Sequence, residues 1–265
     1  MISGLHHVGL PSGRVEYRWI GQKNSTLRDT DLPVLVFLHE GLGSVAQWRD
    51  FPDQVAAAAN LPALVYSRVG YGGSDPCALP RPLTYMHDEG ERELPALLAA
   101  LGIRKHILVG HSDGASIALI YAGSAQRDGL LGLAVLAPHV FCEEVSVASI
   151  AAADRAYAET DLRSRLAKYH GDNVDCAFRG WCDAWLHPDF MQWNIEAYVS
   201  RITVPVLVIQ GEGDEYGTTA QVDSIARRAA GEVETLLLPN CGHSPQRDQP
   251  AATLKALVRF AARRM

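Results

Sequence analysis

Short apolar segments alternate along this chain with longer stretches whose apolar residues recur at helical spacing. Residues 34–38 contain no polar position, which is typical of a strand buried on both faces of a parallel sheet. The pattern predicts strands at residues 14–20, 34–38, 63–66, 106–109, 131–137, 204–210 and 233–238, and helices at residues 48–59, 84–101, 115–121 and 250–263. Because strands and helices alternate, we expect an α/β fold with a mostly parallel central sheet flanked by helices, and with an antiparallel strand at residues 14–20.

The pattern changes between residues 138 and 202, where strand signals are absent for about 60 residues. Helical spacing continues there, at residues 149–160 and 162–169. We therefore expect a helical cap at residues 139–202, inserted into a core made of residues 1–138 and 203–265. The inserted segment holds six large aromatic residues: Phe178, Trp181, Trp185, Phe190, Trp193 and Tyr198. Each one alone is adequately explained as packing between cap and core, but we expect most of the group to line a cavity.

Composition narrows the class of protein. The 265 residues carry a net charge of −6 and contain no block of lysine and arginine, which argues against nucleic acid and anionic membranes as partners. No signal-like start and no apolar run of transmembrane length are present, so we expect a cytoplasmic protein. The five cysteines lack metal-binding spacing, and we expect reduced thiols and neither a metal nor another cofactor.

The motif Gly110-His111-Ser112-Asp113-Gly114 lies between the expected strand 106–109 and the expected helix 115–121. A serine at the tip of a sharp strand-to-helix turn is the arrangement of a nucleophile elbow. The motif alone is also compatible with a glycine-rich turn that holds an incidental serine, and its position between strand and helix favours the elbow. Ser112 is thus the candidate nucleophile.

A serine nucleophile requires a base and an acid, and both follow later in the chain. Asp214 comes just after the strand expected at 204–210, and His243 comes after the last expected strand. His243 would take the proton of Ser112, and Asp214 would orient the imidazole. Glu215 is the alternative acid, whereas Glu212 is interpreted as a solvated loop charge.

The loop after residues 34–38 reads His39-Glu40-Gly41-Leu42. An oxyanion hole at this position would use the backbone N–H of Asp113 and that of Gly41 or Leu42. His39 is interpreted as a brace for the loop. Glu40 has two open interpretations, an ion pair with an arginine such as Arg68 or Arg49, or a contact with a polar or cationic substrate group. The candidate pocket residues are Glu40, His139, Trp181, Trp185 and Trp193.

Five motifs together resemble the α/β-hydrolase superfamily, in its branch of small, capped, carboxylesterase-like serine hydrolases. They are residues 38–41, 70–75, 110–114, 211–214 and 242–245, and the resemblance covers essentially the whole chain. The chain departs from the usual pattern at Glu40, where glycine is common, and at Ser67-Arg68, where an Asp-Arg pair is common. The resemblance implies the α/β-hydrolase fold with Ser112, His243 and Asp214 as a catalytic triad.

The resemblance also bears on the reaction. Dehalogenases and epoxide hydrolases of this superfamily use an aspartate nucleophile, so Ser112 favours acyl transfer to water. Our first hypothesis is an esterase for a small to medium, aromatic or apolar carboxylic ester, acting as a monomer or homodimer. The alternatives are an acyl-CoA thioesterase, a C–C bond hydrolase of aromatic degradation, and a ligand receptor that retains the hydrolase fold without rapid turnover.

Overall fold

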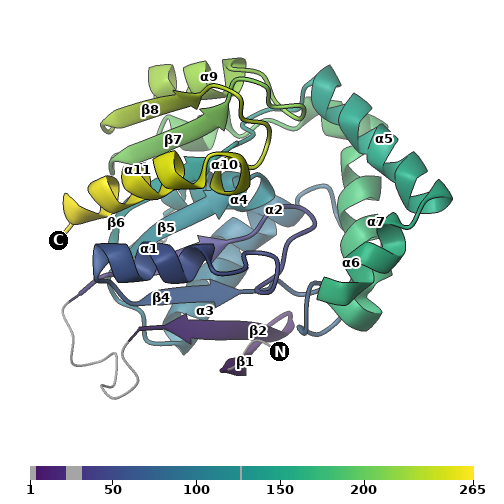
Figure 1. Ribbon diagram of the computed structural model, residues 1–265, viewed down its shortest axis with the longest axis horizontal. Coiled ribbons are helices and arrows are strands. Elements are labelled where there is room, and N and C mark those ends of the chain that lie inside the picture. Colours follow the sequence, from purple (N-terminus) through teal and green to yellow (C-terminus); the bar gives the residue numbers. More distant parts are fainter. Residues whose placement is uncertain (1–3, 22–31, 126) are drawn as a thin grey trace.

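The computed structural model describes residues 4–21, 32–125 and 127–265 (Figure 1). Within these residues one eight-stranded sheet runs in the order β1-β2-β4-β3-β5-β6-β7-β8. Its strands are β1 (Leu5–Leu10), β2 (Gly13–Ile20), β3 (Val34–Leu38), β4 (Ala63–Tyr66), β5 (His106–His111), β6 (Leu130–Leu136), β7 (Val206–Gly211) and β8 (Val233–Leu238). Strand β2 pairs antiparallel with both of its neighbours, β1 and β4. All the other neighbouring strands, from β4 across to β8, pair parallel. The predicted mostly parallel sheet is confirmed.

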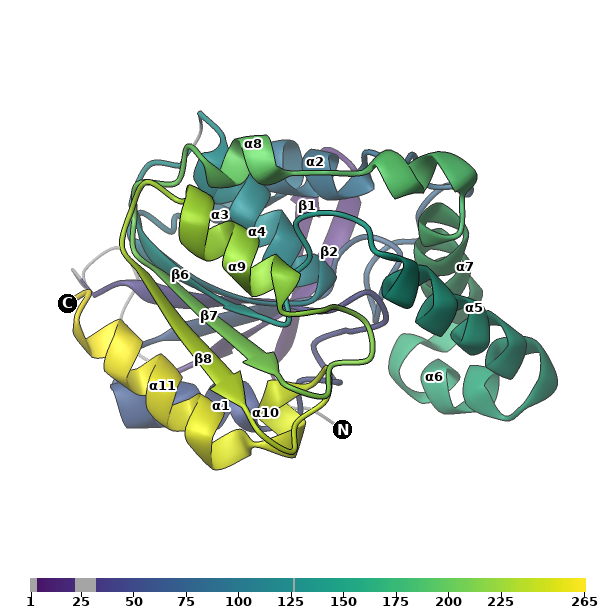
Figure 2. The same ribbon diagram turned by 90° about the horizontal axis from the view of Figure 1, so that it is seen from above.

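The helices cover both faces of this sheet (Figure 2). The α-helices are α1 (Phe51–Ala59), α2 (Tyr85–Asp88), α3 (Leu94–Ala100), α4 (Asp113–Gly123), α5 (Glu144–Glu159), α6 (Leu162–His170), α7 (Val174–Trp185), α8 (Glu196–Val199), α9 (Ala220–Arg228), α10 (Pro245–Asp248) and α11 (Pro250–Ala262). One apolar core joins the sheet to α1 and α11, and a second joins it to α3, α4 and α9. Because both faces are covered, β3 and β5 are buried at every position.

The predicted helix at residues 84–101 is present but is not uniform. A π-helical turn at Glu89–Glu93 separates α2 from α3. The turn places Glu89 in the interior, where burial raises its pKa to about 7 although Arg68 and Arg81 oppose the shift. An inserted π turn re-aims side chains relative to a regular helix, and hydrophobic spacing alone does not reveal it.

Helices α5, α6 and α7 form a group of their own beside the end of the sheet (Figures 1 and 2). They occupy the stretch in which no strands were expected, and the structure places no strand of the sheet there among the described residues. The parallel strands point their carboxyl ends toward this group (Figure 1). The loops that follow β3, β5, β7 and β8 therefore meet the three helices, and in parallel α/β sheets this edge is where ligand sites are found.

Candidate active site

Ser112 occupies a strained turn between β5 and α4. Its backbone has φ +53° and ψ −118°, a conformation that non-glycine residues rarely adopt. The flanking glycines make this turn possible, since a Cβ on Gly110 would overlap the carbonyl oxygen of Gly114, and a Cβ on Gly114 would overlap that of Leu38. The serine side chain is thereby held above the carboxyl end of the sheet, with the N-terminus of α4 directly behind it.

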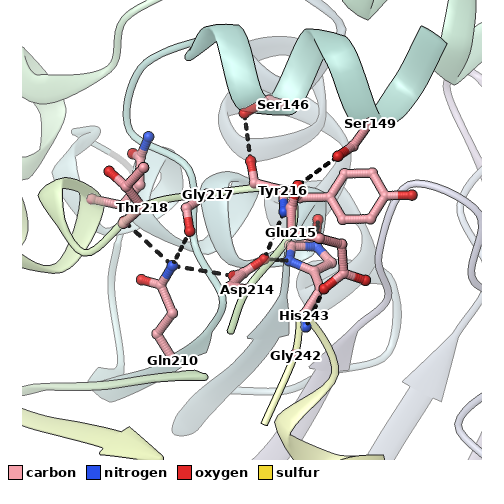
Figure 3. A network of polar contacts seen from close by, with 12 residues as sticks. Ser146, Ser149, Gln210, Asp214, Glu215, Tyr216, Gly217, Thr218, Gly242 and His243 are labelled. Carbon is pink, nitrogen blue, oxygen red and sulfur yellow. Dashed lines mark hydrogen bonds and ion pairs between the residues drawn. The ribbon is translucent and has the colours of Figure 1, made fainter. Parts of the chain in front are cut away.

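His243 lies between the serine and an aspartate. Its Nε2 is 2.9 Å from Ser112 Oγ, and its Nδ1 is 2.8 Å from Asp214 Oδ1. Asp214 is fixed in turn, because the amide of Gln210 donates to Oδ2 at 3.1 Å and the backbone N–H of Tyr216 donates to Oδ1 at 2.9 Å (Figure 3). Burial would raise the pKa of Asp214, but the hydrogen bond and charge of His243 and the N–H of Tyr216 lower it below its usual value. Asp214 is therefore held as a carboxylate facing the imidazole.

Glu215, the alternative acid, has a different position. Its carboxylate accepts the backbone N–H of His243 at 3.1 Å rather than a ring nitrogen (Figure 3). Two serines of α5 hold the same loop, because Ser146 Oγ donates to the Tyr216 carbonyl and Ser149 Oγ to the Glu215 carbonyl, each at 2.5 Å. The acid loop is thus attached to α5 on one side and to the His243 backbone on the other.

The predicted oxyanion donors lie around Ser112. Gly41, Leu42 and Asp113 all line the same cavity as the serine. In the described part of the chain, none of their three backbone N–H groups donates a hydrogen bond. Unpaired N–H groups beside a nucleophile can donate hydrogen bonds to an oxyanion and so stabilise its negative charge, which is the chemistry expected at this position.

His39 braces the loop that carries two of these donors. Its Nδ1 donates to the Glu40 carbonyl at 2.7 Å, and its Nε2 accepts the backbone N–H of Arg68 at 3.1 Å. Burial lowers the pKa of His39 well below its usual value, and the charge of Arg68 lowers it further. A neutral ring with both nitrogens bonded to backbone is suited to hold the loop and has no free nitrogen for proton transfer.

The side chain of Glu40 pairs with neither Arg68 nor Arg49, so these two examples are wrong, and the arginine that faces it is Arg247. Arg68 instead donates to the carbonyl oxygens of His39 and Glu40, at 2.6 and 3.1 Å. The Glu40 carboxylate lies 3.5 Å from His111 Nδ1 and 3.9 Å from Arg247. Burial would raise the pKa of Glu40, but the hydrogen bond and charge of His111 and the charge of Arg247 bring it far below 4.5. Glu40 also lines the cavity, where its carboxylate can contact a polar or cationic group of a ligand.

The cavity beside Ser112 has a volume of about 200 Å³. Its wall toward the three helices is mostly apolar: Ile150, Leu166, Trp181 and Trp185 form it together with Ser146, whose hydroxyl donates to the Tyr216 carbonyl. The expectation that most of the six aromatic residues line a cavity is wrong here, since only Trp181 and Trp185 reach it among the described lining residues. Trp193 was also wrongly placed in the pocket: its ring stacks on Phe190, with ring centres 5.5 Å apart, and packs the helices together. Which aromatic rings face the cavity depends on how the helices of residues 139–202 pack against one another, and the spacing of apolar residues along the sequence does not specify that packing.

His139 lines the cavity next to His243. The two ring centres are 5.6 Å apart, and the centre of the Trp185 ring lies 5.1 Å from that of His139. Burial lowers the pKa of His139 to about 3, and the charge of His243 contributes in the same direction. His139 is therefore a neutral imidazole at neutral pH, able to form a hydrogen bond to a ligand.

One connection at the site was not anticipated from the sequence. The fully buried carboxylate of Asp113 accepts the Tyr85 hydroxyl at 2.5 Å, and Trp185 Nε1 donates to the same hydroxyl at 3.0 Å. This chain of hydrogen bonds joins α7 to the residue after Ser112 through α2. An acid at position 113 of a buried turn indicates that a partner exists, but no pattern in the sequence identifies Tyr85.

Known proteins share this architecture. Residues 35–256 match the model of the alpha/beta hydrolase family, and because the match spans most of the chain, the protein belongs to that family. Among curated relatives, a 2-succinyl-6-hydroxy-2,4-cyclohexadiene-1-carboxylate synthase of Klebsiella pneumoniae (strain 342) is 28% identical over 87% of this chain and 94% of its own. The enol-lactonase from Burkholderia xenovorans LB400 superposes with a TM-score of 0.74 at 21% identity, covering 96% of this chain and 99% of its own. The carboxylesterase CesB from Bacillus subtilis gives 0.70 at 19% identity, covering 98% and 92%.

These comparisons define the fold and the broad class. The α/β-hydrolase fold expected from the motifs is confirmed, and most of the similar proteins are hydrolases. The structural neighbours are below 25% identity, so they support the fold alone. In the described part of the chain, no helix has both the length and the apolar character needed to span a membrane. The described residues also contain no group of three or more histidine, cysteine or acidic side chains arranged to hold a metal ion.

Proposed function

We propose that this protein is a serine hydrolase that cleaves a small to medium, aromatic or apolar carboxylic ester through an acyl-enzyme on Ser112. The observation that carries the proposal is the continuous contact from Ser112 Oγ to His243 to Asp214, with distances of 2.9 and 2.8 Å, at the floor of a cavity. A serine hydroxyl is a weak nucleophile until a base in hydrogen-bond contact takes its proton.

Each residue then has a defined role in the proposed reaction. His243 Nε2 takes the proton of Ser112 as Oγ attacks the ester carbonyl, and the carboxylate of Asp214 stabilises the imidazolium that results. The backbone N–H of Asp113 and that of Gly41 or Leu42 bind the oxyanion. His243 passes its proton to the leaving alcohol, and it later activates the water that hydrolyses the acyl-enzyme.

The size and lining of the cavity support a compact acyl group. A volume of about 200 Å³ with an apolar wall is comparable to cavities of roughly 150 Å³ that hold one benzene molecule. Residues 139–202 are proposed to act as the cap that closes this space, and the two tryptophans that line it, Trp181 and Trp185, both belong to α7. A ligand with one ring or a short chain fits the cavity.

The relative from Klebsiella suggests a different activity, because its name specifies a compound with a succinyl and a carboxylate group. A buried ligand with such acidic groups needs cationic partners. Among the described residues that line the cavity, Arg247 is the sole lysine or arginine, and it lies 3.9 Å from the Glu40 carboxylate. The charge balance therefore favours an uncharged ester over a ligand of that kind.

The experiment is a substrate panel that compares p-nitrophenyl esters of increasing acyl size, short acyl-CoAs and ring-fission dienones. The proposal predicts the highest kcat/KM on a short or aromatic ester, with Ser112→Ala lowering kcat by about 10⁴-fold or more at unchanged melting temperature. Preference for a thioester or a dienone by more than about tenfold would replace the ester with that alternative. A protein that binds these compounds with negligible turnover would instead be a receptor of the hydrolase fold.

A further inference from the structure

Cys77 and Cys176 lie side by side at a junction between the sheet domain and α7. Cys77 belongs to the loop after β4, and Cys176 belongs to the first turns of α7, 99 residues later. The backbone N–H of Cys77 donates to Cys176 Sγ at 3.3 Å. A Cβ on Gly70 would lie 2.8 Å from the sulfur of Cys77 and 3.0 Å from that of Cys176, so both sulfurs meet over the same glycine. Both residues are half-buried and accessible to a small reagent.

Arg81 supplies positive charge to this pair. Its guanidinium also approaches Gly70, and its Nε has no hydrogen-bond partner among the described residues. Arg81 packs against Gly180, one helical turn beyond Cys176 on α7, where a Cβ would lie 2.9 Å from its Cδ. A fixed cation beside a thiol stabilises the thiolate, which is the reactive form of cysteine.

The five cysteines differ in acidity: the pKa is lowered for Cys176 and raised for the other four thiols. The hydrogen bond from the Cys77 thiol is the main cause that lowers the pKa of Cys176 to about 6, and Arg81 contributes. The same hydrogen bond and burial raise the pKa of Cys77. Burial raises the pKa of Cys142 and of Cys241 to about 11, and that of Cys182 to about 12. Cys176, whose sulfur also lies 3.5 Å from the Cys77 carbonyl oxygen, is therefore the most acidic of the five thiols, and Cys77 is its less acidic neighbour.

We propose that Cys176 and Cys77 form a peroxide-reactive pair that closes to a disulfide and ties α7 to the loop after β4. Accessible, acidic cysteines beside a second thiol are the sites where peroxides react selectively. Nothing in the proposed ester hydrolysis uses either residue.

The chemistry balances with hydrogen peroxide as the oxidant. The Cys176 thiolate attacks one peroxide oxygen, the O–O bond breaks, and a sulfenic acid forms with release of hydroxide. The Cys77 sulfur then attacks the Cys176 sulfur, and the S–OH bond breaks as the S–S bond forms. The hydroxyl leaves as water with the proton of Cys77. In total the two thiols lose two electrons and one peroxide is reduced to two waters.

The bond would affect the cavity through α7. Cys176 lies on the same helix as Trp181 and Trp185, which line the cavity beside Ser112. A cross-link at the start of α7 restricts movement of that helix relative to the sheet, and such movement gates many active sites. The oxidised protein is therefore expected to exchange bulky ligands more slowly.

The test treats the full-length protein with about one equivalent of hydrogen peroxide, alkylates the remaining thiols and maps peptides without reduction. We expect a Cys77–Cys176 linked peptide in the wild type and in the Cys142→Ser control. We expect a dimedone-trapped sulfenic acid on Cys176 in Cys77→Ser, and an unmodified Cys77 in Cys176→Ser. The cross-link should also raise the melting temperature by about 5 °C or more, reversibly with dithiothreitol, and only where both cysteines are present.

A second measurement follows the rate of alkylation against pH. The alkylation rate of Cys176 should be nearly constant between about pH 7 and 8. In the same folded protein, the alkylation rate of Cys142 should rise about tenfold over this interval. Oxidation of Cys142 or Cys241 in preference to the pair, a dimedone adduct on Cys77, or sulfinic acid on Cys176 beside a free Cys77 would overturn the proposal. These readouts do not involve ester turnover, so failure here is distinguishable from failure of the proposed function.

Discussion

The indole ring of Trp181 lies directly against Gly41. A Cβ on residue 41 would come within 3.0 Å of Trp181 Cε2 and closer still to Cδ1 and Nε1. Gly41 is in the loop after β3 that carries two candidate oxyanion donors, and Trp181 is on α7, so the contact sets how closely α7 approaches these donors.

Gly41→Ala is therefore expected to displace Trp181 or the loop and to lower kcat/KM for esters by about 10- to 100-fold, since a misplaced oxyanion donor loses much of its effect. The double variant with Trp181→Ala removes the overlap and should recover part of the loss. Gly9→Ala is the matched control, because a Cβ there meets nothing within 4 Å. Steady-state kinetics of the wild type, Gly41→Ala, Trp181→Ala and the double variant measure the coupling, and additive effects would contradict it.

Asp214 and Glu215 are adjacent acids with different contacts. Asp214 meets the Nδ1 of His243, whereas Glu215 accepts the backbone N–H of the same residue. Asp214→Asn should lower kcat by about 10⁴-fold with KM nearly unchanged, because the amide disturbs the tautomer of the imidazole. Glu215→Gln keeps an oxygen that can accept the N–H, so kcat should fall by less than about tenfold. The reverse ranking in initial-rate measurements would identify Glu215 as the acid.

Sequence patterns predicted the interior of the sheet well, because strands buried on both faces carry uninterrupted apolar runs. The ranges expected for the interior strands β3 and β4 agree with the structure at both ends, and so does the range expected for β8 at the opposite edge from β1. The edge strand β1 (Leu5–Leu10) was not predicted, since its side chains are largely exposed and its sequence lacks that signal. Helix α9 was likewise not among the expected elements.

Long-range contacts account for the errors at the site. The Glu40 carboxylate meets His111 and Arg247 instead of Arg68, and all of these residues are distant in sequence. From the sequence alone, no one arginine is favoured over another as the partner of the Glu40 carboxylate, because the fold decides which of them comes close to it. The order Ser112, Asp214, His243 was readable because each residue follows a strand, and the carboxyl ends of parallel strands meet at one edge.

Glu40 is predicted to stabilise the protein in its ionised form. Its pKa in the folded protein lies below 4.5, so this stabilisation is fully present above about pH 4.5 and is lost as the pH falls through the folded-state pKa. Glu40→Gln should lower the melting temperature near neutral pH, by roughly 2–4 °C for each kcal/mol, and the deficit should shrink in acid. Exposed Glu212→Gln is the control. Melting curves with a deficit that is constant down to about pH 3 would contradict this role.

Tyr85 is predicted to be needed by the buried Asp113. Its hydroxyl is the partner of one carboxylate oxygen, and the other, Oδ1, has no hydrogen-bond partner among the described residues. Tyr85→Phe should cost about 1–3 kcal/mol of unfolding free energy, because a buried polar group loses its partner. Tyr198→Phe, which removes a hydrogen bond to Glu91 in a more exposed setting, should cost less than about 0.5 kcal/mol. Denaturant titrations compare the two, and equal losses would show that the buried contact has no special weight.

Covalent labelling tests the central claim most directly. An activated serine beside its base reacts with a fluorophosphonate, whereas unactivated serines do not. We predict a single adduct, located on Ser112 by peptide mass spectrometry, formed in parallel with loss of ester turnover and absent from Ser112→Ala. An adduct on another residue, or full turnover in a protein whose Ser112 is completely modified, would contradict the assignment of Ser112 as the nucleophile.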